Sequence, residues 1–277
     1  MKVCGNDEKF SAMNKTTRNI LITLIGFLFY YLAAENFRKI MNLAAEILYY
    51  KLFSYFITYV IIGIPIFLGT CLIHKNFKIF YHLGLSINFL RGLQFAILFS
   101  LPMFLGGLLF YKFNTQISLP NLVAGTIFAG LFEELYFRGF LFGQIFRNTK
   151  LGFVPSILLG ALIFATAHLY QSQDISTMTG IFLTTFSGAI FFAWLFVEWD
   201  YNLWVPTFLH TLMNLSWILF NIGDNAFGNT SSNLIRGLTI ATTIILTILY
   251  KRKHGQKLSI HRFNLWMKAE MQPKSHS

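Results

Sequence analysis

The sequence predicts an all-α, polytopic membrane protein with about eight transmembrane helices. Of its 277 residues, 55% are hydrophobic and only 12% are charged, whereas soluble domains carry about 25% charged residues. The apolar residues fall into runs of about 20, the length at which a helix spans a bilayer. No repeat, low-complexity tract or linker divides the chain, so we expect one integral-membrane domain over residues 1–277.

The apolar runs give the elements in order. The first is short, and its Leu32-Ala33-Ala34 end is a weak cleavage signal, so we expect it to remain as an uncleaved span. Between the first two spans, residues 35–52 place apolar side chains at helical spacing beside charged ones, which indicates a helix lying in the membrane interface. The predicted spans are residues 19–34, 53–73, 92–111, 121–146, 151–170, 179–197, 206–222 and 234–250.

Charge sets the expected orientation. Lysine and arginine gather in the loops 74–91 and 147–150 and in the tail 251–277, whereas the loops 112–120, 171–178 and 223–233 hold only Lys112. Basic residues accumulate on the cytoplasmic side of membrane proteins, so we expect both termini and a solvated basic tail in the cytoplasm. Binding of residues 260–267 to lipid headgroups is the alternative. The net charge of +11 comes with no nucleic-acid-binding signature, so we expect no nucleic-acid partner.

Three apolar runs are interrupted by ionisable or strongly polar residues. These residues are Glu133, Glu134 and Arg138 in one run, His168 after Phe164 in the next, and His210 with Asn214 in a third. A charged side chain at the bilayer centre costs roughly 2.5–3.5 kcal/mol on insertion scales. We therefore expect the three groups to face one another or a wet cavity within the membrane, as a functional site.

The spacing assigns roles within the first group. Arg138 follows Glu134 by four residues, so the two share a helix face and can pair. Glu133 is then left free for proton transfer. The competing interpretation is an ion pair that serves only structure.

The histidines and the asparagine complete a hydrolytic set. Hydrolysis needs a base for water, a donor for the leaving group and donors for the oxyanion. Glu133 with His168 can supply the first two, and His210 with Asn214, as neutral donors one turn apart, the third. Each of these residues could instead be a satisfied core histidine or an interhelical hydrogen bond.

If the spans simply alternate in direction, His210 does not lie at the same depth in the membrane as Glu133 and His168. Glu133 and His168 lie at similar distances from the 148–150 turn. His210 lies only about five residues into its span, on the opposite side of the 179–197 span. Straight helices rising about 1.5 Å per residue would leave it on the order of 15–20 Å from His168 along the membrane normal. An irregular or uneven span must resolve this, with Gly188 and residues 199–204 as candidates.

The three blocks, in this order, resemble the CPBP family of intramembrane proteases, which includes CAAX prenyl endopeptidases and bacteriocin-processing, self-immunity and Abi proteins. The pattern is Glu-Glu-x-x-x-Arg, Phe-x-x-x-His and His-x-x-x-Asn or -Asp, and the resemblance covers about residues 121–217. It implies an endopeptidase in which Glu133 and His168 activate water and His210 and Asn214 hold the oxyanion; Glu134 and Arg138 are the other residues of its first block, and we assign Arg138 to orienting Glu134. In the eukaryotic relatives the substrates are prenylated proteins.

The resemblance also bears on the cofactor, the partners and the competing functions. The family has been described both as metal-independent and as metallopeptidases. We expect no cofactor, with zinc as the alternative, because Asn214 is a poor zinc ligand. We expect membrane lipid and a peptide or protein substrate, membrane-associated or lipidated, as partners, in a bacterial cytoplasmic membrane. The competing function is a non-catalytic immunity or scaffold protein; a transporter is disfavoured because no inverted repeat is present.

Overall fold

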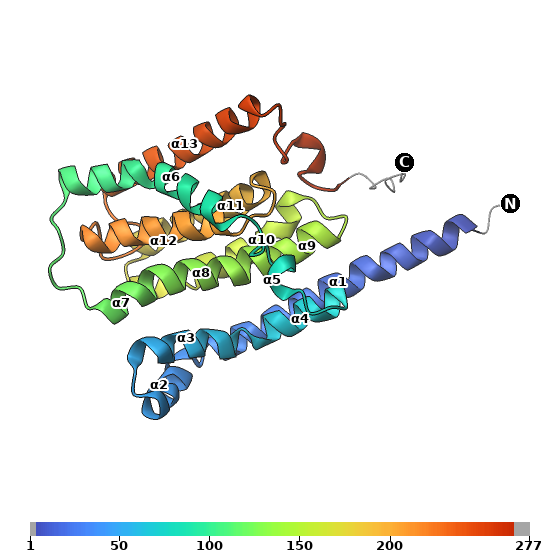
Figure 1. Cartoon of the computed structure of the whole chain (residues 1–277), viewed down its shortest axis with the longest axis horizontal. Helices are drawn as coiled ribbons and strands as arrows, with labels where there is room; N and C mark the ends of the chain where they lie inside the picture. Colours follow the sequence, from blue (N-terminus) through green and yellow to red (C-terminus); the bar gives the residue numbers. More distant parts are fainter. Residues whose placement is uncertain (1–3, 269–277) are drawn as a thin grey trace.

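The computed structural model describes the backbone of residues 4–268 and the side chains from Lys15 onward. It is a bundle of helices whose long axes run roughly parallel (Figure 1). The described residues form no named strand; Leu151 and Met267 make one isolated antiparallel bridge. The all-α prediction is confirmed. The longer helices are α1 (Cys4–Ala34), α2 (Phe37–Leu48), α3 (Lys51–Ile62), α4 (Ile64–His74), α6 (Phe89–Phe110), α10 (Phe153–Thr166), α11 (Ile175–Glu198), α12 (Trp204–Leu219) and α13 (Thr230–Lys253).

Six segments of the described chain are long and apolar enough to cross a membrane. They are Lys15–Ala34, Lys51–His74, Phe89–Phe110, Phe153–Gln171, Ile175–Glu198 and Thr230–Lys253. Two further segments lie alongside them in the bundle (Figure 1): residues 119–148, which carry Glu133, Glu134 and Arg138, and the shorter α12. Each predicted span thus corresponds to helix. The polytopic membrane fold is confirmed, whereas the count of eight crossings stays a prediction.

The segment 119–148 is the least regular helix of the bundle. It runs through α7 (Leu119–Val123), a π-helical turn η1 (Ala124–Phe128), α8 (Ala129–Glu133), a nine-residue π-helical stretch η2 (Glu134–Phe142) and α9 (Gly143–Asn148). Single π turns are common at functional sites. The longer stretch begins at Glu134 itself, so the two adjacent glutamates lie where the helical repeat changes.

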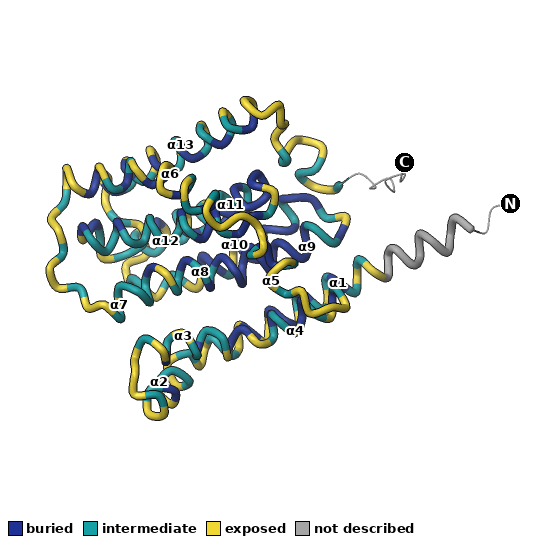
Figure 2. The backbone as a smooth tube through the Cα atoms, in the orientation of Figure 1, coloured by how far each residue is buried: buried dark blue, intermediate teal, exposed yellow. Residues whose placement is uncertain are grey.

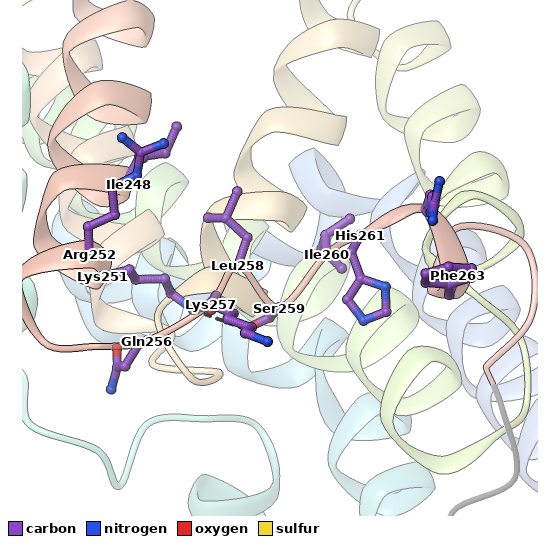
Figure 3. A pocket seen from close by; sticks show the side chains of 11 residues that line it. Ile248, Lys251, Arg252, Gln256, Lys257, Leu258, Ser259, Ile260, His261 and Phe263 are labelled. Atoms are coloured by element: carbon purple, nitrogen blue, oxygen red, sulfur yellow. Dashed lines mark hydrogen bonds between the residues drawn. The ribbon is translucent and has the colours of Figure 1, made fainter.

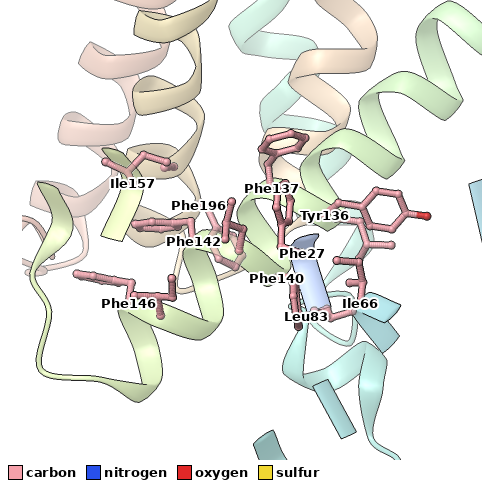
Figure 4. Close-up of a cluster of buried hydrophobic side chains, with 14 of the residues drawn as sticks. Phe27, Ile66, Leu83, Tyr136, Phe137, Phe140, Phe142, Phe146, Ile157 and Phe196 are labelled. Atoms are coloured by element: carbon pink, nitrogen blue, oxygen red, sulfur yellow. The ribbon is translucent and has the colours of Figure 1, made fainter. Parts of the chain in front are cut away.

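Aromatic side chains fill the core around η2. The stretch from Glu134 to Phe142 is buried throughout, and Figure 2 shows that burial concentrates in this part of the bundle. Phe27 of α1 packs edge-on against Phe137 (Figure 4). The hydroxyl of Tyr136 donates to the carbonyl of Tyr59 at 2.6 Å. These contacts fix the rotation of the helix that carries the glutamates.

The turn between α11 and α12 has an irregular backbone. Residues 199–203 leave helical geometry, with φ of +55° at Asp200 and +61° at Tyr201. The prediction of irregular backbone here is confirmed; for Gly188 it is wrong, because α11 runs through it unbroken. The start of α12, a helix of 16 residues, is tied to the connection before α6, because the amide of Leu203 donates to the carbonyl of Gly84 at 3.0 Å. Nδ1 of His210 nevertheless lies 2.8 Å from the carboxylate of Glu134, so the fold brings these two side chains together despite the expected difference in depth.

The chain after α13 is docked on the bundle. We call residues 254–268 the C-terminal strap. The backbone amides of Gly152 and Val154 donate to the carbonyls of Trp266 and Leu265, each at 2.8 Å. The expected solvated tail is therefore wrong for these residues, and residues 269–277 lie outside the described part.

At the other end of the bundle, α2 packs against α3. It is the helix predicted for the 35–52 segment, and its place in the membrane interface stays a prediction.

Candidate active site

The two adjacent glutamates have different surroundings. The side chain of Glu134 is fully buried, and its Oε1 lies 3.1 Å from Nη1 of Arg138 and 2.8 Å from Nδ1 of His210. The side chain of Glu133 is 27% exposed, and its Oε2 lies 3.9 Å from Nε2 of the same histidine. His210 therefore lies between the carboxylate of Glu134, which is paired with Arg138, and that of Glu133, which is partly exposed.

Arg138 is held by charge and by aromatic rings. The guanidinium lies 4.8 Å from the centre of the Phe164 ring and 5.4 Å from that of Phe192. A cation over an aromatic face is stabilised by the ring quadrupole, the more so when it is desolvated. Phe192 also stacks on His210, with ring centres 5.2 Å apart, so one side chain of α11 contacts both partners of Glu134.

Close backbone packing brings α8 and α12 together. A Cβ atom added at Gly130 would lie 2.9 Å from the amide nitrogen of Thr211 and 3.1 Å from the carbonyl of Thr207. Gly130 precedes Glu134 by four residues, and Thr211 follows His210 directly. The missing side chain is what allows the Glu134–His210 hydrogen bond across these two helices.

His168 follows the C-terminal end of α10. Its Nδ1 lies 2.7 Å from the carbonyl of Phe164, and the two rings are in contact with centres 4.5 Å apart. A carbonyl only accepts, so Nδ1 carries the proton and Nε2 of neutral His168 is an acceptor. Among the contacts of residues 15–268, no hydrogen bond or ion pair joins His168 to Glu133; His168 reaches the group through Phe164, which contacts Arg138.

Asn214 lies one turn after His210 on α12. Its amide nitrogen donates to the carbonyl of Gly125 at 3.0 Å. That carbonyl belongs to the π-helical turn η1, so Asn214 links α12 to the irregular part of the glutamate helix. The second hydrogen of the amide remains for another acceptor.

The structure therefore joins Glu133, Glu134, Arg138 and His210 directly, and attaches His168 and Asn214 at the edges of this group. The spacing of the motifs indicated these six. It gave no indication of Phe192, which is one of 32 phenylalanines in apolar sequence, or of the role of Gly130.

Comparison with known families identifies the region that carries this group. Residues 114–216 match the family model described as type II CAAX prenyl endopeptidase Rce1-like. The chain carries an Rce1-like domain. This confirms the resemblance drawn from the motifs, with bounds within about seven residues of the predicted 121–217. No curated protein and no solved structure matches the chain.

The Rce1-like domain contains the whole group. Its bounds include the irregular helix 119–148, α10, α11 and most of α12, which together supply all six residues and Phe192. Since the Rce1-like family is a family of CAAX-protease-like intramembrane peptidases, the buried polar group lies in the part of the chain related to those enzymes.

Proposed function

We propose that the protein is an intramembrane endopeptidase that hydrolyses a peptide bond with an activated water molecule. The main support for this proposal is that the two adjacent glutamates have different contacts. Glu134 is buried against Arg138 and His210. Glu133 has a partly exposed carboxylate, 3.9 Å from His210. A structural ion pair needs only the first of these carboxylates. The second supplies a base beside a proton donor, which is what hydrolysis requires.

Glu133 is the proposed base. Its carboxylate takes a proton from water as the oxygen attacks the scissile carbonyl, and the proton then passes to the leaving amine. The gap of 3.9 Å to His210 is longer than a hydrogen bond and is spanned by one intervening oxygen, from water or substrate. His168, with its proton on Nδ1, offers Nε2 as the second group that accepts from water.

His210 and Asn214 are the proposed oxyanion donors. Ionised Glu134 only accepts, so Nδ1 of His210 carries a proton, and Nε2 donates as well only when the ring is an imidazolium. Two carboxylates and one guanidinium leave one negative charge in this group, which an imidazolium balances. We therefore propose His210 as a charged donor, which differs from the neutral donor expected from the sequence, with the free amide hydrogen of Asn214 beside it.

We propose a mechanism without zinc, and the donor set is one argument for it. A catalytic zinc takes three protein ligands. Among the described residues, no group of three or more histidine, cysteine, aspartate or glutamate side chains lies close enough to hold a metal ion. Glu133 and Nε2 of His210 supply two donors, and Nδ1 of His210 is engaged by Glu134. We derive the mechanism without metal, and metal independence remains part of the proposal.

The proposed substrate is a membrane-associated peptide or protein, lipidated or not, because the reactive group lies on helices of a membrane bundle. We propose the Rce1-like region as the catalytic core of a single membrane domain, with both termini on the cytoplasmic side of a bacterial membrane. Peptide maturation and immunity to antimicrobial peptides are both physiological roles for such an enzyme.

The test is cleavage of a membrane-embedded peptide library by the purified protein in lipid vesicles, in water enriched in ¹⁸O. Wild-type protein should yield new carboxyl termini labelled with ¹⁸O, with and without chelator. Glu133→Gln, at equal folded amount, should yield them about 10²–10⁴-fold more slowly. Cleavage by Glu133→Gln at the wild-type rate would refute the assignment of the base, and cleavage lost with chelator and restored by zinc would refute the metal-free mechanism.

A further inference from the structure

A basic pocket lies between the last turns of α13 and the C-terminal strap, at the end of the bundle where α1 begins (Figures 1 and 3). Its volume is about 850 Å³. Arg252, Lys257, His261 and Arg262 line it together with Ile248 and Leu258. We call this site the strap pocket.

The strap pocket has an uncompensated positive charge. Residues 251–268 contain six lysines and arginines and no aspartate or glutamate. Lys251 is neutralised by Glu198 at 2.9 Å, and no acidic residue lines the pocket. Arg252, Lys257 and Arg262 are exposed, so their charges are available to an anion.

The pocket is built on a fixed backbone. The amides of Ser259 and Ile260 each donate to the buried carboxylate of Glu198 at 2.9 Å, and Lys251 donates to Oγ of Ser259 at 3.0 Å. These bonds anchor the strap to the ends of α11 and α13. The cationic side chains around them are therefore presented at defined positions rather than on a free tail.

Large apolar side chains of the strap lie on its exposed side. Phe263, Trp266 and Met267 are 70%, 69% and 63% exposed. Aromatic residues at the ends of membrane bundles lie at the level of the lipid headgroups. Cations and exposed aromatic side chains on one short segment are the combination that an anionic membrane surface attracts.

We propose that the strap pocket binds the phosphate headgroup of an anionic phospholipid in the adjacent leaflet. Arg252, Lys257 and Arg262 pair with the phosphate, Ile248 and Leu258 contact the glycerol and upper acyl carbons, and Phe263 and Trp266 lie among the neighbouring headgroups. This site is independent of the proposed peptidase activity, and its binding is measured without any substrate.

The experiment is native mass spectrometry of the full chain released from nanodiscs that contain equal amounts of phosphatidylglycerol and phosphatidylcholine. Wild-type protein should retain phosphatidylglycerol in preference. Arg252→Gln/Lys257→Gln/Arg262→Gln should lose this preference, by about fivefold in affinity for each cation removed, and the preference of the wild type should weaken in high salt. Equal retention of phosphatidylglycerol by wild type and triple variant would overturn the proposal.

Two controls separate the remaining outcomes. Lys39→Gln/Lys51→Gln/Lys112→Gln removes three exposed charges at the other end of the bundle and should retain the preference for phosphatidylglycerol. If this variant also loses the preference, the effect is one of total charge, and the proposed site is wrong. Displacement of the lipid by inorganic phosphate alone would identify a free-phosphate site instead. Arg252→Lys/Arg262→Lys, which keeps the charge at both positions, should retain the preference for phosphatidylglycerol.

Discussion

Glu133 and Glu134 are adjacent in sequence but have different surroundings. The chain places one carboxylate against Arg138 and His210, where it is fully buried, and leaves the next 27% exposed. Removing one partner of a buried ion pair leaves an uncompensated charge, which costs far more than the pair contributes. Glu134 and Glu133 should therefore respond to mutation in different ways.

Glu134→Gln should destabilise the protein by about 3–5 kcal/mol, because the buried Arg138 loses its counter-charge. Thermal unfolding of the purified protein in detergent measures this. Glu46→Gln, an exposed glutamate on α2, should leave the unfolding midpoint unchanged. If Glu134→Gln unfolds at the wild-type temperature, Glu134 is not the structural member of the pair.

The motif spacing predicted residues that the fold brings together, but not all of their contacts. The i, i+4 spacing gave the Glu134–Arg138 pair because both lie on one helix. His210 reaches Glu134 across 76 positions of sequence, which periodicity cannot show. Phe192 carries no sequence signal at all, because an aromatic residue in an apolar run fits lipid, core or site equally well.

At the scale of elements, the site depends on how closely α8 and α12 approach. Gly130 faces the backbone of α12 with no space for a methyl group. Hydrophobic run length predicted the spans themselves. It did not predict the π-helical stretch at Glu134, because nothing in the sequence of that stretch distinguishes it from an ordinary α-helix.

Gly130→Ala should push α8 away from α12, destabilise the protein by about 1–3 kcal/mol and lower the rate of peptide cleavage by separating Glu134 from His210. Gly188→Ala is the matched control. It has no neighbour within 4 Å of an added Cβ and lies inside α11, so it should be neutral or slightly stabilising. Equal behaviour of the two variants would contradict the packing argument.

The strap depends on the carboxylate of Glu198. Glu198→Gln should cost about 3–5 kcal/mol, since Lys251 is left without its partner, and should release the strap so that trypsin cuts after Lys257 or Arg262. Glu198→Gln/Lys251→Gln should recover part of the stability but not the trypsin resistance. A strap that stays resistant in both variants would show that the contacts with Gly152 and Val154 suffice.

For the whole molecule, composition and run length predicted the membrane bundle, and charge predicted which ends of the helices group together. The α1 start, the 75–88 connection and the strap lie at the same end of the bundle (Figure 1). What composition could not show is that the connections at this end fold onto the bundle. One of them carries a group sensitive to pH.

His82 lies in the connection after α4, stacked on His74 with ring centres 3.6 Å apart. Burial, together with the charges of His74, Arg147 and Lys78, lowers the pKa of His82 to about 4. Its contribution to stability is therefore full above the ordinary histidine pKa of about 6.5 and is lost as the pH falls toward 4.

The thermal midpoint of the wild type should fall between about pH 7 and pH 5, and His82→Gln should reduce that fall because glutamine does not take up a proton. His254→Gln, which replaces an exposed histidine, should leave the slope unchanged. The same slope in His82→Gln as in the wild type would assign the pH dependence to other groups.

The role of Glu133 as the base is tested most directly by the cleavage rate of Glu133→Gln in lipid vesicles, compared with wild type and Glu46→Gln at equal folded amounts. Loss of a general base lowers the rate by about 10²–10⁴-fold. We expect that loss for Glu133→Gln, with unchanged thermal stability, and a wild-type rate for Glu46→Gln. Cleavage by Glu133→Gln at the wild-type rate would show that Glu133 is not the base.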